Sequence, residues 1–206
     1  MKKNDKTEFM EVKPEDRKQA IITSVLDWLI AIAVGVLVGI LMVVFVVQRD
    51  NVYGDSMVPN LRSGYIVMTD KISTYFDNYD RGDIVILDGE NMEGYNHEEY
   101  LIKRIIGLPG ETVRIADGHV YIREAGAEDF YMLDEPYIDA SVETYVMSWG
   151  MERGYDEITL GEDEYYCLGD NRPVSNDSRN LGPFSADRIK GIAFLIIYPF
   201  NAITFL

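Results

Sequence analysis

The chain has 206 residues, which is enough for one domain of ordinary size with an additional segment. Its formal net charge of −16 argues against a nucleic-acid partner, because phosphate binding needs clustered Lys and Arg. A hydrophobic content of 47% excludes a disordered chain, and a mean hydropathy of −0.09 excludes a protein with many membrane spans. The single cysteine, Cys167, cannot form an internal disulfide, so the core must hold the fold.

The charge is unevenly distributed along the chain. Residues 1–27 contain six basic and six acidic residues, whereas residues 48–206 contain 13 basic and 29 acidic residues. The first segment is therefore neutral, and the second is acidic enough to be repelled by anionic lipid headgroups unless a tether or an apolar surface holds it there.

Residues 28–47 form an uninterrupted apolar run, WLIAIAVGVLVGILMVVFVV. As a helix it spans ~30 Å, the thickness of a bilayer core, and it lacks the polar face of a core helix. A cleavable signal peptide has a shorter apolar stretch followed by small residues. Six Lys and Arg precede the run, and only Arg49 and Arg62 lie in the next 20 residues. We expect a transmembrane helix, a cytoplasmic segment 1–27 and an extracytoplasmic domain 48–206.

Short runs rich in β-branched residues predict strands in the remainder of the chain. Asp117-Gly118 predicts a hairpin turn between two of them. Because Pro199 and Asn201 interrupt the apolar C-terminus, residues 192–206 predict a strand with a membrane-facing end, not a second span. Segments 70–80, 88–99 and 124–160 predict loops, or for 124–160 an inserted subdomain. The predicted strands are 65–68, 84–87, 101–106, 112–115, 120–122, 164–168 and 192–198.

A serine in a turn and a lysine in an apolar strand are candidate catalytic residues. Ser56 lies in a predicted turn shortly after the apolar run. Lys103 and Arg104 are neighbours within an apolar strand, so one of these cations must point where apolar side chains point. Lys103 is either a lysine with its head in water or a desolvated lysine. A pKa lowered by ~3 units by burial leaves a neutral amine near pH 7, which can deprotonate a serine without histidine.

Histidine and metal chemistry have weaker support. His97 and His119 both lie in polar loop or turn contexts without an identifiable carboxylate partner, which disfavours a Ser-His-Asp triad. No ligand spacing such as HExxH occurs, so we expect neither a metal nor a cofactor.

Four motifs follow the apolar run in order: GDSMVPNL (54–61), RGDIVIL (81–87), KRIIGLPGE (103–111) and GDNRPVSNDSR (169–179). Together they resemble bacterial type I signal peptidases of the short, single-span form usual in Gram-positive bacteria, over roughly residues 25–198. This resemblance implies a mostly β fold: one N-terminal transmembrane helix followed by an antiparallel β-sheet catalytic domain of the signal peptidase and LexA-like type. It also implies a serine–lysine dyad.

By position, the resemblance implies that Ser56 is the nucleophile and Lys103 its general base, oriented by Ser175. The Ser56 N–H would be one oxyanion donor, and Gly54 stands where some members place a serine hydroxyl as the second. The residues expected to support the site by fixing turns, pairing charges or excluding water are Met57, Pro59, Arg81, Gly82, Asp83, Arg104, Gly169, Asp170, Asn171, Arg172, Asp177, Ser178 and Arg179.

Two positions depart from the family pattern. Asn60 stands where threonine or serine is usual, and Pro173-Val174 replace polar residues. We expect both changes to be minor, because Ser175, Asp177 and Arg179 keep their spacing.

The implied substrates are secreted preproteins, cut after small residues at positions −1 and −3 (Ala-x-Ala-like sites). The implied location is the plasma membrane, in contact with the lipid bilayer and near the secretion translocon. An extended peptide would pair with sheet edges, with residues 52–58 and 83–87 as candidate walls.

Three alternatives remain. They are a LexA-like self-processing peptidase, a sortase-like transpeptidase with Cys167 as nucleophile, and an inactive membrane-anchored binding domain. The acidic charge and the lack of an N-terminal DNA-binding region argue against the first, and the apolar strand around Cys167 argues against the second. The intact Ser56 and Lys103 argue against the third.

Overall fold

A computed structural model describes residues 14–92 and 100–206, and the chain divides into two compact units, residues 1–44 and 45–206. In the first unit, helix α1 (Pro14–Phe45) contains an apolar stretch, Ile22–Val43, that is long enough to cross a membrane. The helix ends before residue 47, because the chain there joins a sheet: Val47 begins strand β1 (Val47–Asn51), and the Lys71 N–H donates to the Val46 carbonyl. The expected helix 28–47 is therefore two residues too long at its C-terminal end.

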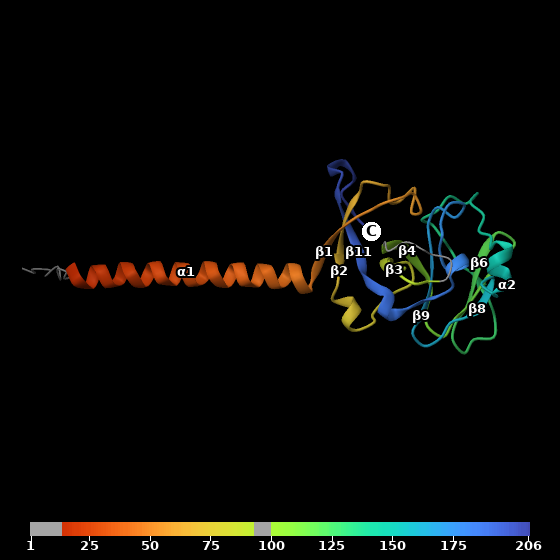
Figure 1. The fold of residues 1–206 in the computed structure, drawn as a ribbon, viewed down its shortest axis with the longest axis horizontal. Coiled ribbons are helices and arrows are strands. Elements are labelled where there is room, and N and C mark those ends of the chain that lie inside the picture. The colour runs from red at the N-terminus through yellow and green to blue at the C-terminus, as the bar shows by residue number, and fades with distance from the viewer. Residues whose placement is uncertain (1–13, 93–99) are drawn as a thin grey trace, which may run out of the picture. The chain divides into compact units, whose positions relative to one another are not determined.

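A large antiparallel sheet forms one part of residues 45–206 (Figure 1). Its strand order is β1-β2-β11-β3-β4-β9-β10, and β12 pairs with β11. The remaining bounds are β2 Ile66–Asp70, β3 Ile84–Asp88, β4 Tyr100–Gly107, β9 Glu164–Leu168, β10 Phe184–Ser185, β11 Ile189–Tyr198 and β12 Thr204–Phe205.

A smaller antiparallel sheet, ordered β7-β6-β5-β8, lies beside it. Strands β5 (Thr112–Ala116) and β6 (His119–Arg123) form the predicted hairpin, and Asp117 and Gly118 both have positive φ angles, as a type I′ turn requires. The other bounds are β7 Tyr131–Met132, β8 Glu157–Thr159, α2 Ser148–Glu152, α3 Ser178–Leu181 and the 3₁₀ turns Ser73–Tyr75, Ala186–Arg188 and Phe200–Ala202.

The mostly β, antiparallel prediction is confirmed, and each of the seven predicted strands overlaps an observed one. Segment 124–160 is not a separate subdomain: it supplies β7, α2 and β8, and so completes the smaller sheet. The 88–99 loop lies only partly within the described residues.

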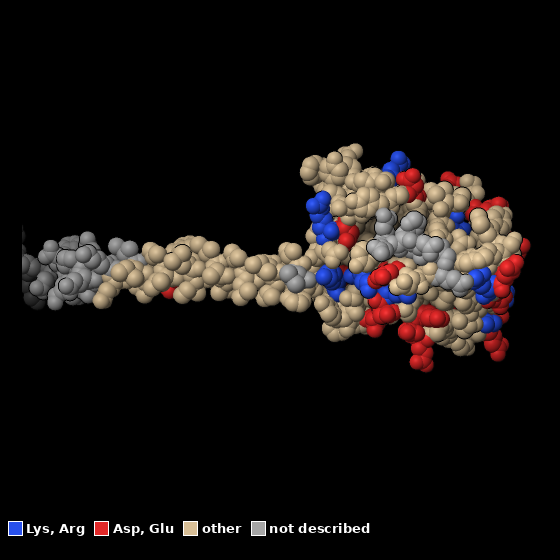
Figure 2. All heavy atoms as spheres, in the orientation of Figure 1, with Lys and Arg blue, Asp and Glu red and all other residues tan. Residues whose placement is uncertain are grey.

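Three groups of buried side chains form the core of residues 45–206. One contains Met57 and Val67 and underlies the segment that carries Ser56. A second packs around Cys167 and Phe184. The third lies where the two sheets meet and includes Tyr166. Figure 2 shows Asp and Glu side chains scattered over the visible face of this unit, with Lys and Arg among them, and almost no charge on the described part of α1.

Candidate active site

Ser56 and Lys103 lie together. Lys103 extends from β4, and its Nζ atom is 2.9 Å from Ser56 Oγ and 2.8 Å from the Ile102 carbonyl oxygen. Lys103 is 2% exposed, so it is a desolvated lysine and not one whose ammonium group lies in water. Its neighbour Arg104 is also buried, so both cations of the pair lie inside the domain.

Burial lowers the pKa of Lys103 from its ordinary value of 10.5 to about 8, against the opposing effect of the Asp177 and Asp170 carboxylates. A substantial fraction of Lys103 is therefore neutral in mildly alkaline solution. A neutral amine at hydrogen-bond distance from a hydroxyl can accept its proton as the oxygen attacks an acyl carbon.

The turn that carries Ser56 is fixed by the loop that follows β9. The Asn171 N–H donates to the Ser56 carbonyl at 2.9 Å, and Asn171 Nδ2 donates to the Asp55 carbonyl at 3.0 Å. Gly169 has no space for a Cβ, which would lie 2.5 Å from the Ser56 carbonyl oxygen. Gly54 has a φ of +76°, and a Cβ there would meet open space, so the second oxyanion donor has no obvious protein source at this position.

Ser175 does not orient Lys103 through a hydrogen bond in this structure. Lys103 donates to Ser56 and Ile102, whereas the buried Ser175 hydroxyl interacts with the Asp177 carboxylate and helps to lower its pKa. Ser175 nevertheless lies near the nucleophile, because its Oγ and the Ser56 carbonyl oxygen both approach the space above Gly169.

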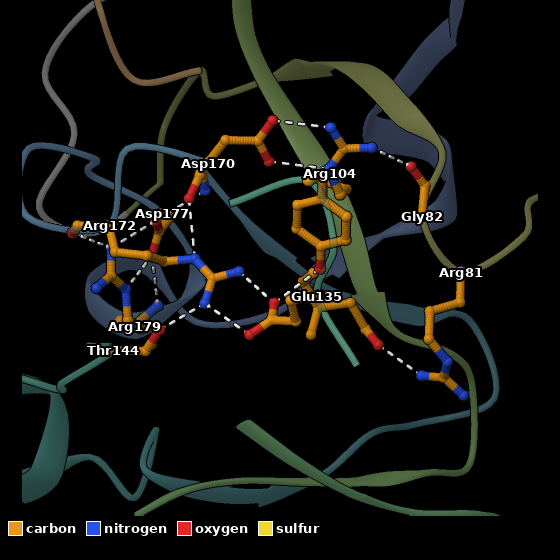
Figure 3. A network of polar contacts seen from close by, with 12 residues as sticks. Arg81, Gly82, Arg104, Glu135, Thr144, Asp170, Arg172, Asp177 and Arg179 are labelled. Carbon is orange, nitrogen blue, oxygen red and sulfur yellow. Dashed lines mark hydrogen bonds and ion pairs between the residues drawn. The ribbon is translucent and has the colours of Figure 1, made fainter. Parts of the chain in front are cut away.

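Arg104 links β4 to the loop after β9 (Figure 3). Its Nε and Nη2 atoms donate to the Asp170 carboxylate at 2.8 Å each, and its Nη1 donates to the Gly82 carbonyl. Asn60 joins the nucleophile segment to the same carboxylate: its Nδ2 donates to Asp170 Oδ2 at 2.8 Å and to the Tyr137 carbonyl at 2.7 Å. A buried ion pair in this position fixes Lys103 and Ser56 relative to each other through the backbones that hold them.

Segment 133–147 closes the other side of this network. The Arg172 guanidinium is fully buried, donates to both Glu135 oxygens and to Thr144 Oγ1, and reaches back to the Gly169 carbonyl (Figure 3). The Tyr137 ring lies 4.1 Å from the Arg104 guanidinium, and its hydroxyl donates to Glu135 Oε1 at 2.7 Å. Burial, then the Glu135 charge, raises the pKa of this hydroxyl, so it remains a donor.

Asp177 holds the far end of the loop. Burial raises the pKa of its carboxyl, but hydrogen bonds and charge from Arg179 outweigh burial and keep that pKa below its usual range. The carboxylate accepts from Arg179 and from the Gly169 N–H. Ser178 Oγ accepts from the Cys167 N–H at 2.9 Å, which ties the loop to β9.

The remaining predicted residues lie in the core beneath Ser56 or in the turns around the site. Met57 is buried in the core beneath Ser56, and Pro59 follows a cis peptide bond. Arg81 binds both oxygens of Glu111, and Asp83 accepts from the Asp80 N–H. Gly82 has a φ of +98°, which allows its carbonyl to meet Arg104.

Ser56 and Lys103 both line a cavity of about 620 Å³. Its walls come from residues 49–53 and 100–103, with Val67 and Ile86 at its apolar base. The expected wall 83–87 therefore contributes only Ile86. In the described part of the sheet, β9 pairs with β4 only from Arg104 onward, so residues 100–103 present an unpaired strand edge to the cavity.

Sequence reasoning missed three members of this site: Asn60, treated there as a minor change, and Glu135 and Tyr137, placed in an acidic loop. The departure from the family pattern at Asn60 was the one available signal. The thiol alternative has no support, because Cys167 is fully buried and burial raises its pKa. His119 is exposed in the β5–β6 hairpin, and His97 lies outside the described residues.

Comparison with known proteins identifies the family of this chain. The profile of the family "Signal peptidase, peptidase S26" matches residues 25–198. Signal peptidase I S of Bacillus subtilis (strain 168) is 34% identical, over 86% of this chain and 91% of that protein. Signal peptidase I of Bacillus amyloliquefaciens is 33% identical, over 93% of this chain and 98% of that protein. A solved signal peptidase I from Enterococcus faecalis V583 is 28% identical, covering 56% of this chain and 96% of that one with a TM-score of 0.43. This chain belongs to the signal peptidase family, peptidase S26.

Proposed function

We propose that this chain is a membrane-anchored serine endopeptidase that removes N-terminal signal peptides from secreted preproteins. The observation that carries the proposal is the buried Lys103 amine 2.9 Å from Ser56 Oγ, within a cavity that has an open strand edge.

The reaction follows from the two side chains. Neutral Lys103 takes the Ser56 proton as Oγ attacks the carbonyl carbon of the scissile bond. The Ser56 N–H stabilises the oxyanion, and the Lys103 ammonium then returns the proton to the departing amine. An acyl-enzyme on Ser56 remains. Lys103 then takes a proton from a water molecule as that water attacks the acyl carbon and releases Ser56.

Substrate selection follows from the cavity. A signal peptide pairing with residues 100–103 presents alternate side chains to one wall, so positions −1 and −3 face the same side. Val52, Val67, Ile86 and Ile102 make that wall apolar and limit its depth, which suits small side chains such as Ala.

The orientation of the chain is part of the proposal. The excess of Lys and Arg before the apolar stretch favours a cytoplasmic N-terminus and an extracytoplasmic catalytic domain at the plasma membrane. Exposed Phe200, Ile203 and Phe205 around β12 suit contact with the lipid bilayer. Substrates emerge at the secretion translocon, and a tethered enzyme meets them at a raised effective concentration.

The test uses the full chain in detergent micelles and a fluorogenic peptide whose apolar stretch ends in Ala-x-Ala. Cleavage after the second Ala is expected, and it should disappear in Ser56→Ala and when Phe replaces the Ala at position −1. Cleavage that persists in Ser56→Ala, or that ignores the Phe, overturns the proposal.

A further inference from the structure

A second cavity, of about 450 Å³, lies outside the one that contains the dyad. Segment 141–147 forms one side of it, and the loop from Arg172 to Asn180 forms the other. Its size falls within the range of ligand-binding clefts. No residue is shared between the linings of the two cavities.

The linings of the two cavities come close to each other around Gly169, which is buried and lines neither. A Cβ on this residue would lie 2.2 Å from Ser175 Oγ and 2.5 Å from the carbonyl oxygen of Ser56; Ser175 lines the second cavity and Ser56 the first. The Asn171 N–H donates to that same carbonyl, so the loop that borders the second cavity is bonded to the nucleophile segment. The second cavity therefore lies close to Ser56.

The chemistry of the second cavity favours an apolar peptide. Met147 is 70% exposed and Tyr145 is 58% exposed, and both side chains line the cavity together with Val142 and Pro173. Its two arginines are already neutralised, Arg172 by Glu135 and Arg179 by Asp177. The site is therefore not an anion site, and the carboxylate of Glu143 in its lining disfavours acidic side chains.

We propose that the second cavity binds the residues that follow the scissile bond, the first residues of the mature chain, and favours an apolar side chain among them. This inference rests on the proposed function. The first cavity is assigned to the residues before the cut, because apolar side chains line it beside the dyad, and the second lies close to the Ser56 carbonyl oxygen without sharing a lining residue. Pro173, which departs from the polar family pattern, lines the second cavity.

The test compares two peptides with the same Ala-x-Ala signal side. The long peptide continues for six residues after the cut, with Leu at the third, and the short peptide ends one residue after the cut. The full chain in detergent micelles is assayed as wild type, Met147→Ser and Tyr145→Ser, because both residues line the cavity. Met147 is the residue before α2, where Ser is a favoured helix cap, so this variant should fold. Met132→Ser, at a methionine on β7 that is also exposed and lies outside the cavity lining, is the matched control.

Burial of one such side chain predicts that the long peptide exceeds the short one about tenfold in kcat/KM, mainly through KM, in the wild type and in Met132→Ser. The ratio should fall to about threefold or less in Met147→Ser and Tyr145→Ser. An unchanged ratio in these two variants overturns the inference and leaves the proposed function intact. If the wild type cleaves neither peptide, both fail.

Crosslinking supplies a second measurement that does not depend on turnover. A long peptide with benzophenone at the third residue after the cut is irradiated with the Ser56→Ala variant and mapped by mass spectrometry. Crosslinks are expected within 141–147 or 172–180. Crosslinks confined to 49–53 or 100–103 contradict the assignment.

Discussion

Asn60 Nδ2 lies 2.8 Å from Asp170 Oδ2 and 2.7 Å from the Tyr137 carbonyl oxygen, so one amide joins three segments that are 77 and 110 residues apart in the chain. Asp170 in turn holds Arg104, the neighbour of Lys103. The position of the lysine relative to Ser56 therefore depends on contacts that lie outside the dyad.

Asn60→Ala should lower kcat by about tenfold and the free energy of unfolding by about 1–2 kcal/mol, because Asp170 and the Tyr137 carbonyl each lose a donor. The kcat and the free energy of unfolding of Asn60→Thr should lie between those of Asn60→Ala and the wild type, since a hydroxyl can donate to only one of the two acceptors. Steady-state kinetics and thermal unfolding in micelles measure both effects. Wild-type kinetics in Asn60→Ala would show that this link is dispensable.

Lys103→Met should abolish cleavage but stabilise the fold at pH 7. Since burial lowers the pKa of Lys103 from 10.5 to about 8, the folded protein holds a buried ammonium below pH 8. The shift corresponds to about 3 kcal/mol, and loss of the lysine hydrogen bonds removes about 1 kcal/mol, which leaves a gain of about 2 kcal/mol.

The same shift predicts how the gain varies with pH. Between pH 8 and 10.5 the unfolded chain keeps the lysine proton and the folded chain has lost it, so wild-type stability rises and the advantage of Lys103→Met shrinks. Tryptophan fluorescence during thermal unfolding at pH 7 and pH 10 tests this. Lys190→Met, at a partly exposed lysine on β11, is the control. Equal stability of the wild type and Lys103→Met at pH 7 would contradict the buried-ammonium argument.

Glu135→Ala should destabilise the domain by about 3–5 kcal/mol, because the fully buried Arg172 guanidinium then lacks its counter-charge. Glu157→Ala removes the partner of Arg114 in an exposed ion pair and should change stability by less than about 1 kcal/mol. Urea unfolding of both variants gives the comparison. Similar effects from the two would mean that the Glu135–Arg172 pair adds little.

Gly54→Ser should raise kcat about tenfold over Gly54→Ala, because the hydroxyl offers a second oxyanion donor. Both variants carry the same backbone strain at a φ of +76°, and both side chains enter open space. The Ser-to-Ala ratio therefore isolates the hydroxyl. A ratio near one indicates that the oxyanion is already fully stabilised by other donors.

Local patterns predicted much of the fold but little of the network. Apolar runs bounded by turn residues gave the predicted strands, and Asp117-Gly118 predicted its hairpin. Strand β1 has the polar sequence VQRDN at the edge of the sheet, so no apolar alternation indicates it, and β7, β10 and β12 have only two residues each. The motif order pointed to Ser56 and Lys103, but strand alternation alone did not decide whether Lys103 or Arg104 was buried, and both are.

The supporting contacts depend on tertiary packing. Glu135 meets Arg172 across 37 residues, and nothing in the acidic sequence around Glu135 distinguishes it from its solvent-exposed neighbours. The buried position of the Ser175 hydroxyl likewise follows from the path of the loop above Gly169, which no residue pattern predicts.

The pH dependence of kcat/KM for the Ala-x-Ala peptide tests the central claim, that neutral Lys103 is the base for Ser56. The base must be deprotonated, so the rate should rise with pH through a single ionisation near the Lys103 pKa of about 8 and then level off. Ser56→Ala should show no cleavage at any pH. A wild-type rate that is flat from pH 5 to pH 9 would contradict the account.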